Sequence, residues 1–301
     1  MNKRLLKIFL FFLLFIICDR GISFILTIGL NKYFGLNQHS KILLIGHSEL
    51  MLATDHSRIE NELNCFVSKY CKEGATIEDR LQMVKQYIES PYSDSLQVVV
   101  LGVDSYMFKG EGLSKNSYTT LYPYIDNPLI RRYIKEHTST PEFIKHYLIH
   151  SQRFSDALIN SSIRGWLNNR SNYKFGILDT TVLNRQILSN QQRTIEFDKE
   201  QMLIFEQIVQ YIASKKIHLI LLRTPIIEQL NNCEPQKHNK LDAYFHSIAD
   251  NSKYIEYWDI NKDISSHHEY FFDSIHLNRD GQQIATQKII QLFYNNKQIL
   301  L

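Results

Sequence analysis

Two polar motifs, far apart in the 301-residue sequence, contain residues that could act together on an acyl group. Asp273 precedes His276 by three residues, so its carboxylate can turn back on one loop and accept the Nδ1 proton of the imidazole. Nε2 would then remain free as a base toward a hydroxyl group, and Ser48 supplies such a hydroxyl in the sequence Gly46-His47-Ser48. Taken alone, an Asp-x-x-His pair is more often a polar surface turn, and a serine after a strand more often caps a helix.

The residues before Ser48 predict where its hydroxyl lies. Residues 42–45 are all apolar and run directly into Gly46, a pattern typical of a strand that is buried on both faces of a parallel sheet. The glycine allows the backbone to turn sharply, which leaves Ser48 at the carboxyl end of the strand. Ligands of open α/β sheets bind at that edge, so we expect Ser48 to face a binding site.

Segments typical of strands and helices alternate over most of the remaining sequence. We expect further buried strands at 64–68, 97–101, 217–222 and 254–259, with amphipathic helices at 77–88, 200–213, 241–249 and 279–294. The alternation predicts an α/β fold with a parallel sheet. Thr76 and Asp79 form a capping-box-like pair before the first of these helices, which places Gly74 in a turn at the same edge as Ser48.

The alternation is lost in the middle of the chain, between about residues 109 and 190. We interpret this region as a helical insertion beside the edge that carries Ser48, with helices at 127–149 and 154–169. Three tyrosines of the insertion are expected to pack in a core, and the alternative is that they line a substrate groove; they are Tyr118, Tyr122 and Tyr124.

The first 34 residues are typical of a membrane anchor. Basic residues open the sequence and precede a long apolar run, and one helix over 5–30 would cross a ~30 Å hydrocarbon core. Asp19 and Arg20 would then lie near the far interface or pair with each other. A cleaved signal peptide is the alternative, but no small-residue cleavage site follows the run. We expect an uncleaved single-pass anchor and linker in 1–34, followed by one domain at 35–301 that faces outward.

Composition narrows the classes of function. Hydrophobic residues make up 44% of the chain and charged residues 22%, which predicts a packed core. A net charge of +3 is too small to indicate nucleic-acid binding. The four cysteines are scattered and form no CxxC pair, so neither a zinc site nor a disulfide framework is expected. We therefore expect no metal and no cofactor.

These motifs, in this order, resemble the SGNH (GDSL-type) hydrolase superfamily. Gly46-His47-Ser48 resembles its first block, with the nucleophile at Ser48, although His47 replaces the aspartate of Gly-Asp-Ser. The turn at Gly74 resembles the second block, whose glycine N–H joins the serine N–H in an oxyanion hole. Asp273-x-x-His276 resembles the fifth block, which supplies the orienting acid and the base. The resemblance covers residues 41–104 and 217–295 and leaves the middle unmatched. It implies an α/β fold of three layers with a flavodoxin-like parallel sheet.

Within the superfamily the motifs look closest to membrane-anchored proteins similar to the D-alanyl transfer protein of teichoic acid modification and to polysaccharide O-acetyltransferases. This resemblance implies one N-terminal membrane helix and an extracytoplasmic catalytic domain. It also implies an acyl-enzyme at Ser48 that transfers an acyl group to, or hydrolyses an ester on, a cell-envelope glycan. A membrane-bound acyl exporter is a candidate partner. A plain deacetylase or carboxylesterase is the simpler alternative.

One position departs from the family in a way that bears on catalysis. Gly102-Val103-Asp104 stands where the third block has Gly-x-Asn, whose side-chain N–H₂ donates to the oxyanion. An ionised aspartate has no proton to donate and would repel negative charge. Three outcomes are open: Asp104 points away, it is protonated, or catalysis is weak. The departure also supports a different function, a catalytically idle domain that binds a glycan or a partner in a membrane assembly.

Overall fold

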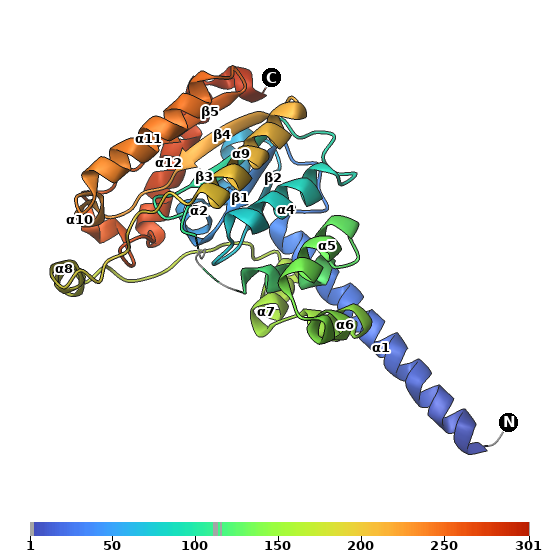
Figure 1. Ribbon diagram of the computed structural model, residues 1–301. Helices are drawn as coiled ribbons and strands as arrows, with labels where there is room; N and C mark the ends of the chain where they lie inside the picture. Colours follow the sequence, from blue (N-terminus) through green and yellow to red (C-terminus); the bar gives the residue numbers. More distant parts are fainter. Residues whose placement is uncertain (1–2, 111–113, 115, 301) are drawn as a thin grey trace. The chain divides into compact units, whose positions relative to one another are not determined.

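The computed structural model describes residues 3–110, 114 and 116–300, which form two compact units (Figure 1). One unit combines Met1–Asn37 with Tyr118–Arg170, and the other combines Gln38–Ser117 with Ser171–Leu301. Helix α1 therefore folds with part of the middle region. The division into an anchor at 1–34 and a domain at 35–301 stays a prediction.

The second unit is built on a parallel sheet of five strands in the order β2-β1-β3-β4-β5. The strands are β1 (Ile42–Gly46), β2 (Val67–Cys71), β3 (Val98–Val103), β4 (His218–Arg223) and β5 (Ile255–Asp259). This order is that of flavodoxin-like sheets, in which ligands bind beyond the carboxyl ends of β1 and β3, where the winding changes direction. The predicted α/β class and parallel sheet are confirmed.

Helices cover both faces of this sheet, which gives the three predicted layers (Figure 1). One face carries α4 (Ile77–Ile88), α9 (Lys199–Ser214) and α11 (Pro235–Asp250). The other face carries α2 (Ser48–Ala53), α3 (His56–Leu63) and α12 (Arg279–Asn295). Shorter elements complete the unit: α8 (Thr180–Leu188), α10 (Glu228–Asn231), η3 (His268–Tyr270) and η4 (Lys297–Leu300). Thr76 and Asp79 form the predicted capping box at the start of α4.

Two predicted boundaries are wrong for local reasons. Strand β2 was expected at 64–68, but Asn64 adopts a left-handed conformation (φ 50°) that ends α3, so the strand starts three residues later, at Val67. The helix expected at 127–149 is two helices, because Ser139 caps a new helix with Pro141 in its first turn.

The first unit consists of helices: α1 (Lys3–Phe34), η1 (Ser117–Tyr124), α5 (Pro128–His137), α6 (Thr140–Leu148), η2 (His150–Arg153) and α7 (Asp156–Trp166). Helix α1 is long and apolar enough to cross a membrane, which is weak evidence by itself. Its residues from 3 to 18 are all exposed. Tyr118, Tyr122 and Tyr124 are buried, so they pack in a core rather than line a groove.

Helices α1 and α7 cross at two glycines, Gly29 and Gly165, where their backbones meet. A Cβ atom on Gly29 would overlap Ser162 of α7, so we expect Gly29→Ala to destabilise this unit by about 1–3 kcal/mol through overpacking. Gly21 lies in the same helix with no heavy atom within 4 Å of its would-be Cβ, and Gly21→Ala is the matched control. Thermal unfolding of the detergent-solubilised variants compares them; equal melting temperatures would contradict the expectation.

Candidate active site

Ser48 is the first residue of α2, directly after the carboxyl end of β1. His47 caps this helix, and its Nδ1 accepts the N–H of Glu49 at 3.0 Å. The helix packs tightly on the strand ends, because Cβ atoms on Gly46 and Gly102 would lie 2.8 and 2.9 Å from the Cβ of Leu50. The glycines of the first and third motifs therefore have a steric role: they let α2 approach the sheet.

The far end of α2 is fixed by a buried lysine. Lys69 Nζ of β2 donates to the carbonyl oxygens of Met51 (2.7 Å) and Thr54 (2.5 Å). These carbonyls lie at the end of the helix, where a cation is favourable. The Thr54 hydroxyl also donates to Leu50 O at 2.8 Å. Helix α2, and Ser48 with it, is thus held at both ends.

The structure brings together the three residues predicted to form a catalytic triad: Ser48, His276 and Asp273. His276 Nε2 lies 2.8 Å from Ser48 Oγ, and His276 Nδ1 lies 2.8 Å from Asp273 Oδ2. The partners assign the tautomer: Nδ1–H donates to the carboxylate, and Nε2 accepts the serine hydroxyl. The second oxygen, Asp273 Oδ1, accepts the backbone N–H groups of Ile275 and His276, both at 3.0 Å. The carboxylate therefore fixes both the loop and the ring.

The Asp273 carboxyl is ionised in this arrangement. Partial burial raises its pKa, but hydrogen bonds from the His276 side chain and from two backbone N–H groups outweigh this effect, so its pKa is below the usual value. An anion beside Nδ1 stabilises the imidazolium that forms when Nε2 takes a proton. The three groups can therefore activate Ser48 as a nucleophile.

The loop that carries His276 is held by a neighbouring segment that sequence patterns did not single out. Asn278 caps α12, with Oδ1 accepting the N–H of Gly281 at 3.0 Å. Its Nδ2 donates to Gly176 O at 2.9 Å and to Glu269 O at 2.7 Å. Backbone bonds from Leu178 and Arg279 add two more links between residues 174–178 and this loop. No periodicity or motif in 174–178 could have indicated this role.

Gly74 follows β2, the strand that pairs with β1, and so lies at the same sheet edge as Ser48. Its φ of +71° favours glycine, and a Cβ there would lie 3.1 Å from the Cβ of Ser114. The structure therefore explains why this turn needs glycine. Its role as an oxyanion donor stays a prediction.

Asp104 is buried at the end of β3, and its carboxyl group faces the Arg80 guanidinium and the His47 imidazole. Oδ2 lies 2.8 Å from His47 Nε2 and 3.4 Å from Arg80 Nη2, and Oδ1 accepts the N–H of Tyr106 at 2.9 Å. Burial raises its pKa, but the contacts with His47 and Arg80 outweigh this effect, so its pKa is below the usual value. The neighbouring guanidinium of Arg80 therefore favours an ionised Asp104 over a protonated one. An ionised carboxylate cannot donate to an oxyanion.

The groups around Asp104 balance its charge. Burial lowers the pKa of His47 more than Asp104 raises it, so the ring is neutral, with Nε2–H donating to Asp104. Burial, and then the Asp104 charge, raise the pKa of Glu49 well above its usual value, which favours the neutral carboxyl. Its Oε2 accepts the hydroxyl of Thr224 at 3.0 Å. Asp104 and Arg80 remain as one buried ion pair.

His47, Glu49 and Asp104 are also the residue types that bind metal ions, and their ligand atoms lie within 4.8 Å of one another. The Arg80 guanidinium, however, lies beside the same Asp104 oxygen that would have to bind the ion. A cation placed there would be repelled by it. We therefore treat this trio as a hydrogen-bonded network that supports Ser48 rather than as a metal centre.

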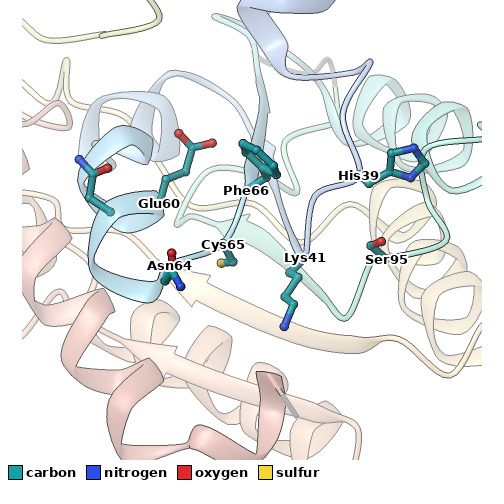
Figure 2. Close-up of a pocket in the computed structure, with 8 residues that line it drawn as sticks. His39, Lys41, Glu60, Asn64, Cys65, Phe66 and Ser95 are labelled. Carbon is teal, nitrogen blue, oxygen red and sulfur yellow. The ribbon is translucent and has the colours of Figure 1, made fainter.

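Figure 2 shows a pocket of about 440 Å³ at the edge of the sheet where the strands begin. Its lining includes Lys41, Phe66 and Ser95, which precede β1, β2 and β3 at their amino ends. Ser48 and Gly74, in contrast, follow the carboxyl ends of β1 and β2. This pocket is therefore not part of the site formed by Ser48, His276 and Asp273.

Comparison with known proteins gives distant structural similarities. No family model matches the sequence, and no curated protein matches it. A protein from Streptococcus pneumonia, provisionally named a platelet activating factor, is 13% identical with a TM-score of 0.44, over 98% of this chain and 100% of that chain. A provisionally named acylhydrolase from Bacteroides fragilis is 13% identical with a TM-score of 0.41, over 87% of this chain and 89% of that chain.

A family two carbohydrate esterase from Clostridium thermocellum, in complex with cellohexaose, is 10% identical with a TM-score of 0.40, over 87% of this chain and 66% of that chain. All three TM-scores are below 0.5, so the function is inferred from the site and its motifs.

Proposed function

We propose that this protein is a serine-dependent esterase or O-acyltransferase. The observation that carries the proposal is the arrangement of a catalytic triad, in which His276 contacts both Ser48 Oγ and Asp273 Oδ2 at 2.8 Å. His276 Nε2 takes the proton of Ser48 as the Oγ attacks an acyl carbonyl, and the imidazolium then protonates the leaving alcohol. The resulting acyl-enzyme is released when His276 deprotonates a water molecule or a second hydroxyl.

Negative charge on the tetrahedral intermediate needs hydrogen-bond donors. We infer that the backbone N–H groups of Ser48 and Gly74 supply them, as the resemblance of their motifs implies. The N–H of Ser48 is in the first turn of α2, where backbone donors have no partner within the helix. Asp104 contributes by holding His47, the cap of that helix, rather than by donating.

We propose that the substrate is an acyl ester on a cell-envelope glycan, and that α1 anchors the enzyme with its larger unit outside the cytoplasm. Support comes from the membrane-anchored branch that the motifs resemble and from the basic start before the apolar helix. A membrane-bound acyl exporter is the proposed donor. Digestion of residues 35–301 by external protease in cells stripped of outer barriers checks this orientation; full protection would contradict it.

A serine-reactive phosphonate tests the chemistry directly. We expect it to label the full-length protein at Ser48, to fail with Ser48→Ala, and to block turnover of a small acetyl ester. Ser105→Ala is a matched control, because Ser105 follows β3 at the same sheet edge but contacts His238 rather than His276. Faster acetyl release when a glycan acceptor is added would identify transfer, and indifference to the acceptor would identify hydrolysis.

The second candidate is an idle domain that binds a glycan or a membrane partner. The observation that favours it is the Asp104 carboxyl, which stands in place of an amide donor and contacts Arg80 Nη2 at 3.4 Å. Under this alternative the phosphonate leaves Ser48 unlabelled and the small ester is not turned over, although the protein is folded.

A further inference from the structure

The part of α1 that is exposed on every side, residues 3–18, is too short to cross a bilayer by itself. The unbroken apolar run from residue 8 to residue 18 rises about 16 Å, whereas a hydrocarbon core is ~30 Å thick. About nine more residues of helix, to roughly residue 27, must therefore lie in the bilayer. Burial within the unit already begins at Asp19, so the two regions overlap.

In the overlap, α1 has one face toward lipid and one toward protein. Ile22, Phe24 and Ile25 are 50–67% exposed, as expected of a lipid-facing surface. Asp19 and Ser23 lie on the other face and are only 5% exposed, where α1 packs against η2 and α7. Elements η2 and α7 must then lie at the same depth as this part of α1.

The polar groups of the overlap are satisfied inside the unit, as burial at this depth requires. The Asp19 carboxylate accepts the backbone N–H groups of His150 (2.9 Å) and Ser151 (2.8 Å). Arg20 Nη2 donates to Leu148 O at 3.4 Å. The expectation that Asp19 pairs with Arg20 is wrong, because each bonds the backbone around η2 instead.

The elements beside α1 carry their own exposed apolar side chains. Leu148 at the end of α6 is 59% exposed, and Ile163 and Leu167 of the α7 region are 50% and 72% exposed. Trp166 Nε1 donates to Ile25 O at 3.1 Å, and Lys32 Nζ lies 4.0 Å from the Trp166 ring centroid. A tryptophan beside a lysine is typical of the membrane–water interface.

We propose that the unit formed by α1 and residues 118–170 is itself seated in the membrane, with Leu148, Ile163 and Leu167 in contact with lipid acyl chains. Lipid is the occupant because Leu148 and Trp166 contact α1 at Arg20 and Ile25, within the part of α1 whose apolar side chains Ile22 and Ile25 are exposed. The proposal rests on the proposed anchoring by α1 and adds that the unit is embedded rather than tethered above the surface.

Tryptophan fluorescence tests this, because the chain has only two tryptophans and Trp258 is buried in the other unit. The full-length protein is placed in phosphatidylcholine vesicles whose acyl chains are brominated near the headgroup. We expect emission of Trp258→Phe, in which Trp166 is the remaining tryptophan, to fall about twofold relative to unbrominated vesicles. Emission of the wild type should fall by less, because Trp258 still contributes unquenched emission, and Trp166→Phe should remove the quenching. The wild type keeps the test valid if Trp258→Phe fails to fold.

A matched pair of variants extends the test in the Trp166→Phe background. Leu148→Trp and Leu188→Trp both place an indole at an exposed leucine, 59% and 85% exposed respectively, but Leu188 belongs to the other unit. We expect the brominated lipids to quench the fluorescence of the new tryptophan in Leu148→Trp and not in Leu188→Trp. If the protein floats with the vesicles but Trp166 and Leu148→Trp are as unquenched as Leu188→Trp, the proposal is overturned while anchoring stands, and this face is left for a protein partner. If the protein does not float with vesicles, anchoring itself is wrong, and the proposal fails with it.

Discussion

Replacing His276 with alanine is expected to lower kcat/KM for a small acetyl ester by about four to six orders of magnitude, the range seen when a relay residue is removed from other serine hydrolases. The variant loses Nε2, the acceptor that lies 2.8 Å from Ser48 Oγ, and with it the proton donor for the leaving alcohol. Hydrolysis assays on the full-length variant measure the loss.

The control is His268→Ala, since His268 lies in η3, shortly before the same loop, but its side chain is exposed and faces Glu269. Its rate should be close to that of the wild type. The double variant Ser48→Ala with His276→Ala should be no slower than either single variant, because the two groups act as one unit. A double variant that loses the product of the two single effects would mean that Ser48 and His276 act separately.

The sheet could be predicted from the sequence because its strands are buried on both faces and read as unbroken apolar runs. Residues 42–45 and 217–222 are examples, and both became strands with nearly the predicted limits. The start of β2 could not be predicted so well. The residues around Asn64 fit a strand or a helix end equally, and in the structure Asn64 ends α3 in a left-handed conformation, with its N–H donating to Glu60 O.

The meeting of Ser48 with His276 and Asp273 could also be predicted, because both motifs follow segments that end at one edge of a parallel sheet. The ionisation state of Asp104 could not be predicted. It depends on Arg80 from α4 and on His47 from the β1–α2 turn, which come close only in the folded chain. Whether a buried carboxyl is ionised is decided by such neighbours, and local sequence does not reveal them.

Asp19 shows the same limit in the helical unit. A charged residue in an apolar helix suggested an interface position or a pair with Arg20. Its actual partners are two backbone N–H groups of η2, more than 130 residues away in sequence. Every residue except proline has the same backbone N–H group, so the sequence does not indicate which of these groups a buried carboxylate will bind.

Asp104→Asn is expected to lower the free energy of unfolding by about 3–5 kcal/mol, because it leaves the buried guanidinium of Arg80 without its counter-ion. Chemical denaturation of the full-length protein in detergent measures the change. Asp94→Asn is the matched control: Asp94 also contacts a histidine, His39, but both are exposed to solvent, so little change is expected.

A double-mutant cycle identifies the cause of the loss. Arg80→Met removes the cation, and in that background Asp104→Asn should cost much less than in the wild type. If both backgrounds lose the same free energy, Asp104 stabilises the fold through His47 and the Tyr106 N–H rather than through the ion pair.

The pH dependence of stability is a second test of the charge on Asp104. The pKa of Asp104 is lower in the folded protein than the ~3.9 of an unfolded chain, so the unfolded state binds the proton more readily. The stabilisation is therefore complete above about pH 4 and is lost as the pH falls below that value toward the folded pKa. We expect wild-type stability to fall more steeply than that of Asp104→Asn below about pH 4, so the two curves should converge in acid. Parallel curves would mean that Asp104 is not the ionised partner of Arg80, and the electrostatic account of this site would then have to be abandoned.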